Sequence, residues 1–418
     1  MKSSIVDAPL RRYNKGTSRR AQGNRGPGTR VRFVAGIAAL FLASGAPAAP
    51  FLPTDDAQVL ERLPSRNTAQ FRALKSLQAA AAQAPNDLPH ATALATAYIR
   101  VSRLEGDPRF LGYAQAALTP WWKDPAAPTA VLILRATILQ SNHQFDAAIA
   151  DLNTVLQREP KSTQALLTRA TVLTVQGKYL EARDACVRLF GVAPEIYGVI
   201  CVAAVDSMTG KAGAAYEALQ RALLTLPRID AGGRVWAETL LGEIAHRRGD
   251  PAAEGHFRAA LGVGDKDLYL LGAYCDWLLD RGRPAEVIPL LQSETRVDAL
   301  LLRLALAQQA LKRPEAADAI ATLRARFDAS HARGDTVHQR ENARFELFLL
   351  GDAKGALPYA VANWQVQREA ADLRILAEAA AAANDVAALG TVKRWLAETG
   401  LEYPAVAALV GAGVSQAK

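Results

Sequence analysis

The chain has 418 residues, of which 50% are hydrophobic and 6% aromatic, and its formal net charge is +8. Residues 1–48 contain nine Lys or Arg and one acidic residue, which leaves 40 basic and 40 acidic residues for the rest of the chain. Residues 49–418 are therefore neutral overall. This excludes a nucleic-acid interface driven by net charge, and we expect no nucleic-acid partner.

An export signal is predicted for residues 1–48. Phe33–Ala43 is an apolar run of 11 residues, basic residues precede it, and Ala46-Pro47-Ala48 has the A-x-A form of a cleavage site. We expect cleavage after Ala48 and a periplasmic or secreted mature protein. The alternative is an uncleaved inner-membrane anchor, although a membrane-spanning helix needs about 20 apolar residues.

The basic segment before this run is long for an export signal. Ser18-Arg19-Arg20 contains a twin arginine, but Ala21-Gln22-Gly23 lacks the apolar residues that normally follow one. A start near Val31 would leave a compact signal. The sequence keeps both starts open, at Met1 and near Val31.

Residues 49–66 are predicted to connect the signal to the folded part of the chain, with one short helix over Asp55–Leu63. Asn67 and Gln70 then have the spacing of a capping box, which predicts a helix that runs to Ala84. We interpret these two helices as a divergent first unit of a repeat array.

The unit His90–Trp122 has apolar positions for two helices. Between them stands Gly106-Asp107-Pro108, in which glycine ends one helix, aspartate caps the next and proline occupies its first turn. Trp121–Pro125 is predicted as a longer connector to the unit that follows.

The clearest pattern is a segment that occurs twice, 34 residues apart, over 129–162 and 163–195. The matching positions are Ala136 and Ala170, Leu139 and Leu173, Phe145 and Tyr179, Ala148 and Ala182, and Pro160 and Pro194. Each copy predicts two helices around a polar turn, with the alanines where the helices cross. A third copy over 196–228 keeps Ala203, Ala215 and Pro227 at a spacing of 33.

This pattern resembles the tetratricopeptide repeat (TPR) family, whose helix–turn–helix unit has 34 residues. The resemblance implies an all-α, right-handed α-solenoid of about nine or ten TPR-like hairpins, since one hairpin cannot bury its apolar face alone. Weaker copies continue after residue 228, so a single solenoid is predicted over 67–409, with a tail over 410–418. A Gly-containing loop is expected over Arg228–Arg234 and a polar connector over Asp328–Gln339.

The resemblance also implies a binding surface, because in that family the first helices of successive repeats line a concave groove that holds extended peptides or partner helices. The positions expected to face this groove are Gln140, Thr171, Thr174, Tyr197, Ser207, Trp236, Glu243, His246, Arg247, Tyr269, Asp276 and Asp280. Aromatic anchors favour binding. The alternative for Trp236 and Tyr269 is partly buried packing.

Three cysteines occur, Cys186, Cys201 and Cys275, and an odd number leaves at least one unpaired. Cys186 and Cys201 are predicted on consecutive helices, so a disulfide forms if their Cα atoms approach to about 5.5–6 Å. The alternative is three buried small residues, and the sequence leaves the pairing open. Cys275 occupies the position of Ala136 in its unit, which favours burial.

Motifs for catalysis and metal binding are missing from the sequence. The six histidines form no HExxH motif and no tight Cys/His group, and the chain has no GxSxG motif and no GK[ST] phosphate loop. We therefore expect no enzyme activity, no metal and no cofactor.

The sequence thus predicts an exported scaffold that binds a protein or peptide partner along its concave face. The resemblance implies a role in cell-envelope assembly, secretion or polysaccharide export. One alternative is a ligand- or carbohydrate-binding accessory to an enzyme, which a deep pocket with carboxylates near Glu243 and Asp276 would favour. Another is a membrane-anchored assembly factor, whose uncleaved signal segment would be its membrane contact. The partner, the pathway and the oligomeric state stay open.

Overall fold

The structure is a computed structural model that describes residue 55 and residues 68–226, 229–264 and 267–415. Contacts divide the described residues into two units, one with residue 55 and residues 68–75 and the other with the residues from 76 on. All of the helix pairs lie in this second unit. The described residues form twenty α-helices joined by turns, and they contain no strand.

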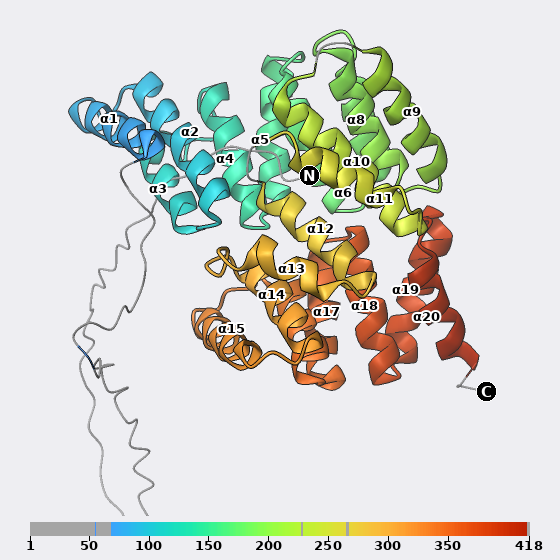
Figure 1. The fold of residues 1–418 in the computed structure, drawn as a ribbon. Coiled ribbons are helices and arrows are strands. Elements are labelled where there is room, and N and C mark those ends of the chain that lie inside the picture. The colour runs from blue at the N-terminus through green and yellow to red at the C-terminus, as the bar shows by residue number, and fades with distance from the viewer. Residues whose placement is uncertain (1–54, 56–67, 227–228, 265–266, 416–418) are drawn as a thin grey trace, which may run out of the picture. The chain divides into compact units, whose positions relative to one another are not determined.

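Nine consecutive helix pairs run from α2 to α19 (Figure 1). In each pair two successive helices pack against one another across a short connection. The pairs are α2 (Leu88–Glu105) with α3 (Arg109–Ala117), α4 (Thr129–Ser141) with α5 (Phe145–Arg158), α6 (Thr163–Val175) with α7 (Tyr179–Val187), α8 (Glu195–Asp206) with α9 (Ala212–Thr225), α10 (Ala231–Arg248) with α11 (Ala253–Leu261), α12 (Leu268–Asp280) with α13 (Pro284–Leu291), α14 (Asp298–Ala310) with α15 (Glu315–Ala332), α16 (Gln339–Arg344) and its π-helical continuation η2 (Phe345–Leu350) with α17 (Ala353–Val366), and α18 (Ala370–Ala383) with α19 (Val386–Thr399). Helix α1 (Ala69–Gln83) precedes the pairs, a 3₁₀ turn (Thr119–Trp121) follows α3, and α20 (Pro404–Ser415) ends the described chain.

The small residues of the repeat lie where the helices of a pair cross. Ala136 and Ala148 are fully buried between α4 and α5, as is Ala182 on α7. Phe145 and Tyr179 begin the second helices and are also buried. The prediction of an all-α solenoid of TPR-like hairpins is confirmed, with one helix pair in each of the three clearest repeats.

A buried arginine fixes the connector between the first two pairs. Arg135 lies among the apolar positions of α4, and its guanidinium forms two hydrogen bonds of 2.7 Å with Asp151 on α5. The same group donates to the carbonyl oxygens of Trp122 and Asp124. Because a buried charge needs both an opposite charge and full hydrogen bonding, this arrangement lets an arginine occupy a core position.

Two predicted connections are wrong in extent. The loop expected over Arg228–Arg234 gives way to α10 at Ala231, because the Asp230 carboxylate accepts a hydrogen bond from the Gly233 amide and caps the helix. The connector expected over Asp328–Gln339 is shorter, since α15 continues to Ala332.

The predicted domain boundaries stay predictions. Helix α20 runs to Ser415, within the segment predicted as the tail over 410–418. The signal over 1–48, the helix over Asp55–Leu63 and the cap at Asn67 fall outside the described residues, apart from residue 55. The Thr68 hydroxyl accepts a hydrogen bond from the Phe71 amide at the start of α1. None of the described helices is both long enough and apolar enough to cross a membrane.

The C-terminal helices return to the middle of the array. The Arg368 amide, just before α18, donates to the Val175 carbonyl oxygen at the end of α6, over 2.7 Å. Trp395 of α19 packs against Tyr179, and the Glu402 carboxylate accepts from the Ala212 amide. Helix α20 also packs against α10 (Figure 1). The first helices of the central pairs therefore face helices of the same chain.

The cysteine pairing that the sequence left open is made. Cys186 at the end of α7 and Cys201 on α8 form a disulfide, with their Cα atoms 5.3 Å apart. Cys275 is free and buried on α12, and burial raises the pKa of its thiol to about 12.

We therefore expect air-oxidised protein, unfolded without reductant, to react with a maleimide at one of its three cysteines. Mass spectrometry should place the label on Cys275, and prior reduction should allow three labels. Three labels without reductant would contradict the disulfide.

Candidate functional site

A cavity of about 710 Å³, called here the repeat cavity, lies within the helix pairs. Its walls come from α6, α8, α10, α12 and α14, which are the first helices of five successive pairs. The residues that precede α16 and α18 also line it, with the first turns of these two helices. Further lining residues are Pro108 and Leu111 at the start of α3, residues 141–144 at the end of α4 and in the turn that follows it, and Cys186 of α7. The concave face predicted from the repeat pattern is thus partly covered by the C-terminal part of the chain.

The structure brings together seven of the twelve residues expected on the groove. Thr171, Thr174, Ser207, Glu243, Arg247, Tyr269 and Asp276 line the repeat cavity. His246 lines a smaller neighbouring cavity of about 130 Å³ that also reaches Glu243, Arg247 and Asp276. Gln140, Tyr197, Trp236 and Asp280 line neither cavity.

Two of those four residues pack between repeats. Tyr197 of α8 and Trp236 of α10 lie with ring centroids 6.4 Å apart, and both pack against the buried core of residues 196–349. The Tyr197 hydroxyl donates to Asp230, the cap of α10. Trp236 therefore takes the packing position that the sequence left as its alternative. Gln140 is buried within α4, with 7% of its surface exposed.

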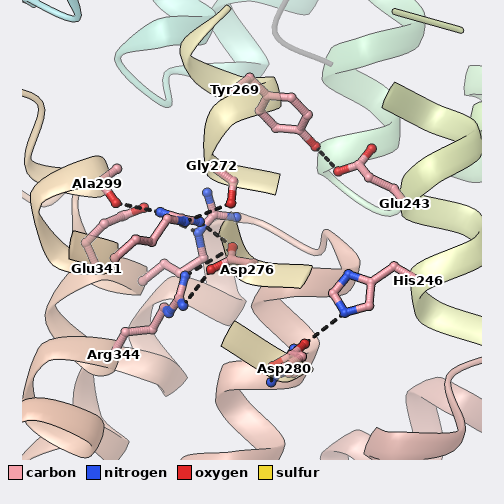
Figure 2. A network of polar contacts seen from close by, with 12 residues as sticks. Glu243, His246, Tyr269, Gly272, Asp276, Asp280, Ala299, Glu341 and Arg344 are labelled. Atoms are coloured by element: carbon pink, nitrogen blue, oxygen red, sulfur yellow. Dashed lines mark hydrogen bonds and ion pairs between the residues drawn. The ribbon is translucent and has the colours of Figure 1, made fainter. Parts of the chain in front are cut away.

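Glu243 and Tyr269 meet across α10 and α12. Figure 2 shows the Tyr269 hydroxyl directed at the Glu243 carboxylate, with 2.5 Å between the oxygen atoms. Tyr269 exposes 38% of its surface, but it does so to the repeat cavity. The enclosing walls and the nearby Glu243 carboxylate raise the pKa of this phenol well above its ordinary value, so the hydroxyl stays a donor.

Asp276 is held by two arginines that come from different pairs. Its carboxylate accepts from Arg303 of α14 over 2.5 Å. It also accepts from Arg344 of α16 over 2.8 Å (Figure 2). Burial opposes the ionised form of Asp276, but the two guanidinium groups outweigh burial and hold its pKa well below the usual range. Asp276 is therefore ionised, and the two arginines neutralise its charge on the cavity wall.

Asp280, one turn further along α12, joins α10 to α18. It accepts from the His246 ring over 2.8 Å and from Arg374 through two hydrogen bonds. Partial burial would raise the pKa of Asp280, but the hydrogen bonds from Arg374 and His246 prevail and lower it to about 2. Figure 2 shows His246 directed at this carboxylate.

Arg340 at the start of α16 is the centre of a third group. It forms ion pairs with Glu341, Glu369 and the fully buried Asp372. Asp372 accepts a further hydrogen bond of 2.9 Å from the Asn363 side chain. Three carboxylates thus surround one guanidinium group.

The functional residues that sequence reasoning missed come from these C-terminal helices. Arg344 and Arg374 lie 68 and 94 positions after the α12 carboxylates that they bind. Arg340 of α16 binds Glu369 and Asp372 at the start of α18, 29 and 32 positions further along. A repeat pattern encodes the neighbours of each hairpin, and it carries no signal for such distant partners.

The arrangement offers binding chemistry. Within the described ranges no three His, Cys, Asp or Glu side chains are grouped so that they could hold a metal ion. The carboxylates Asp276 and Asp280 are committed to arginines. We find charged and polar groups held in place on the walls of a cavity.

No family model matches the chain, and no curated protein matches it. Among solved structures, a tetratricopeptide repeat protein from Parabacteroides merdae covers 61% of this chain and 93% of its own, at 16% identity and a TM-score of 0.35. Human IFIT1, as a dimer with m7Gppp-AAAA, covers 83% and 86%, at 13% identity and a TM-score of 0.38. The TPR-like architecture stated above rests on the helix pairs themselves.

The arginine pairs of Asp276 make a prediction about stability. Asp276→Asn should lower the free energy of unfolding by about 3–5 kcal/mol, because it leaves two largely buried guanidinium groups without their counter-charge. The measurement is urea unfolding followed by far-ultraviolet circular dichroism.

Glu217 of α9 provides the matched control, since it pairs with Arg221 on the exposed surface. Glu217→Gln should cost less than about 1 kcal/mol. Equal losses for the two variants would show that the Asp276 pairs do not hold the helices.

Proposed function

We propose that this protein is an exported helical-repeat scaffold that holds a short segment of a partner protein in the repeat cavity. Its fold is a helical-repeat scaffold, an architecture suited to protein interaction. The observation that carries the proposal is the gathering of first-helix residues from five successive pairs on one cavity of about 710 Å³. A volume of this size lies within the range of ligand sites, about 300–1,000 Å³.

The covered face limits the length of the segment. A solenoid with an open groove can hold a long extended peptide, whereas here α16 and α18 occupy part of the concave side. The walls are fixed by ion pairs before any ligand binds, so little conformational entropy is lost on binding. A few residues of a partner therefore suffice for recognition.

Two observations support the exported setting. The N-terminal sequence has the features of a cleavable signal. In addition, the Cys186–Cys201 disulfide is of a kind that persists in oxidising compartments such as the periplasm. Within the cell envelope, the scaffold would serve assembly, secretion or polysaccharide export.

A second candidate is a small-ligand or carbohydrate-binding accessory to an enzyme. The enclosed cavity with Glu243 and Asp276 on its walls favours this candidate. Asp276, however, is saturated by two arginines, so of these two carboxylates Glu243 is the one available to a sugar hydroxyl. We therefore prefer the protein segment.

A nucleic-acid ligand fits the cavity poorly. Its lining carries five carboxylates, Glu243, Asp276, Asp335, Glu341 and Glu369, against three arginines, Arg247, Arg303 and Arg340. Phosphate groups would meet a net negative wall. The capped RNA in the human IFIT1 structure belongs to that protein.

Site-specific photo-crosslinking in the native cell tests the proposed function. A photoreactive residue at Thr174, on the cavity wall, should give a discrete adduct whose mass identifies the partner. The matched control is Leu224 on α9, which is 87% exposed on a second helix. No adduct from Thr174, or the same adduct from both positions, would count against binding in the cavity.

The exported setting has its own test. N-terminal sequencing of the protein isolated from the cell envelope should begin at Ala49, the residue after the expected cleavage site. A peptide from residues 1–30 in the native protein would contradict the short signal, and detergent dependence of its release would favour the anchored alternative.

A further inference from the structure

One carboxylate on the cavity wall has no opposite charge. The Glu243 carboxylate accepts a hydrogen bond from the Tyr269 hydroxyl, and within the described chain it forms no ion pair with a lysine, arginine or histidine. Arg247, one turn along α10, is turned to the Ser207 carbonyl and hydroxyl oxygens instead. An ionised carboxylate in an enclosed site attracts a cation more strongly than it would in water.

A buried oxygen on the same cavity also lacks a partner. Gln367 exposes 3% of its surface, lines the cavity, and has no hydrogen bond to its side-chain oxygen Oε1. The orientation of its amide follows from its neighbours. Asn363 donates its Nδ2 to Asp372, so its Oδ1 is left to accept from Gln367 Nε2 at 3.4 Å. The Gln367 oxygen therefore has no donor. A buried acceptor without a donor lowers stability, and a ligand N–H that bonded to it would remove this penalty.

One hydrogen-bond donor among the lining residues also lacks an acceptor. Arg247 Nε is buried and has no hydrogen-bond partner. The residues that line the cavity thus include a carboxylate without an ion pair, a side-chain carbonyl oxygen without a hydrogen-bond donor and an arginine N–H without an acceptor. A peptide with an ammonium group offers the complements of all three, namely a cation, a backbone N–H and a backbone carbonyl.

We propose, on the basis of the function proposed above, that the bound segment carries a primary ammonium group that pairs with Glu243. The net negative lining described above favours such a ligand and disfavours an anionic one. The ammonium can come from a lysine side chain or from a free amino terminus, and the two sources present the same chemistry to the carboxylate.

Three tripeptide amides distinguish the sources by isothermal titration calorimetry with the mature protein. N-acetyl-Ala-Lys-Ala-amide has only a side-chain ammonium, Ala-norleucine-Ala-amide has only an amino-terminal one, and N-acetyl-Ala-norleucine-Ala-amide has none. We expect at least one ammonium probe to bind about tenfold more tightly than the neutral probe, with the advantage falling as salt is added. Equal affinities for all three probes, or no binding of any, would overturn the inference.

Glu243→Gln provides the matched variant. The amide oxygen of glutamine can still accept from the Tyr269 hydroxyl, so the change removes the charge and keeps the hydrogen bond. Its melting temperature should stay close to that of the wild type, while the advantage of the ammonium probe should disappear. Glu217→Gln, on the exposed side of α9, should leave the affinities unchanged. An ammonium preference that survives in Glu243→Gln would also overturn the inference.

The crosslinking experiment separates the two proposals. If the Thr174 probe forms its adduct equally well with Glu243 and with Gln at that position, the cavity binds a partner without the ammonium pair. In that case this inference fails and the proposed function stands. If the Thr174 probe forms no adduct in either background, the proposed function fails as well.

Discussion

The ion pairs between α12 and the C-terminal helices are the interaction on which the repeat cavity depends. Asp276 with Arg344, and Asp280 with Arg374, join residues 68 and 94 positions apart. Pairs of this kind lose much of their Coulomb energy to desolvation, so their main effect lies in specificity of geometry. An apolar contact tolerates several registers of one helix on another, whereas a forked guanidinium on a carboxylate accepts few. Together with the backbone bond from Arg368 to Val175, these pairs determine where the returning helices stop.

The sequence predicts the parts of the fold that depend on near neighbours. Ala136, Ala148 and their repeats mark helix crossings because a crossing within a hairpin involves residues about a dozen positions apart. Where composition and capping disagree, the prediction fails. Gly232 and Gly233 are typical of a loop. The Asp230 carboxylate, however, accepts from the Gly233 amide at the helix start, and α10 begins before both glycines. The repeat pattern does not predict the contact between the start of α18 and the end of α6, because each repeat specifies only the hairpins beside it.

The candidate site was predictable to the same extent and for the same reason. Knowing which helices come first in each pair places Thr174, Glu243, Tyr269 and Asp276 on the concave side. It does not say how far each helix is rotated, so Trp236 lies against Tyr197 instead of on the cavity wall. Gln367 could not have been found at all, because its role arises from one unpaired oxygen after Asn363 and Asp372 have been satisfied.

Covering the concave face changes how such a scaffold discriminates between ligands. An open groove gains affinity with each residue that a peptide lays along it, and selectivity is then spread over many weak contacts. In an enclosed cavity the walls are already formed, and discrimination falls to the few groups that the protein leaves unmatched. A ligand without a donor leaves the Gln367 oxygen as it was, and an anionic ligand meets the net negative lining. Under the proposed function, selectivity therefore comes as much from the penalty on unsuitable ligands as from attraction to the right one.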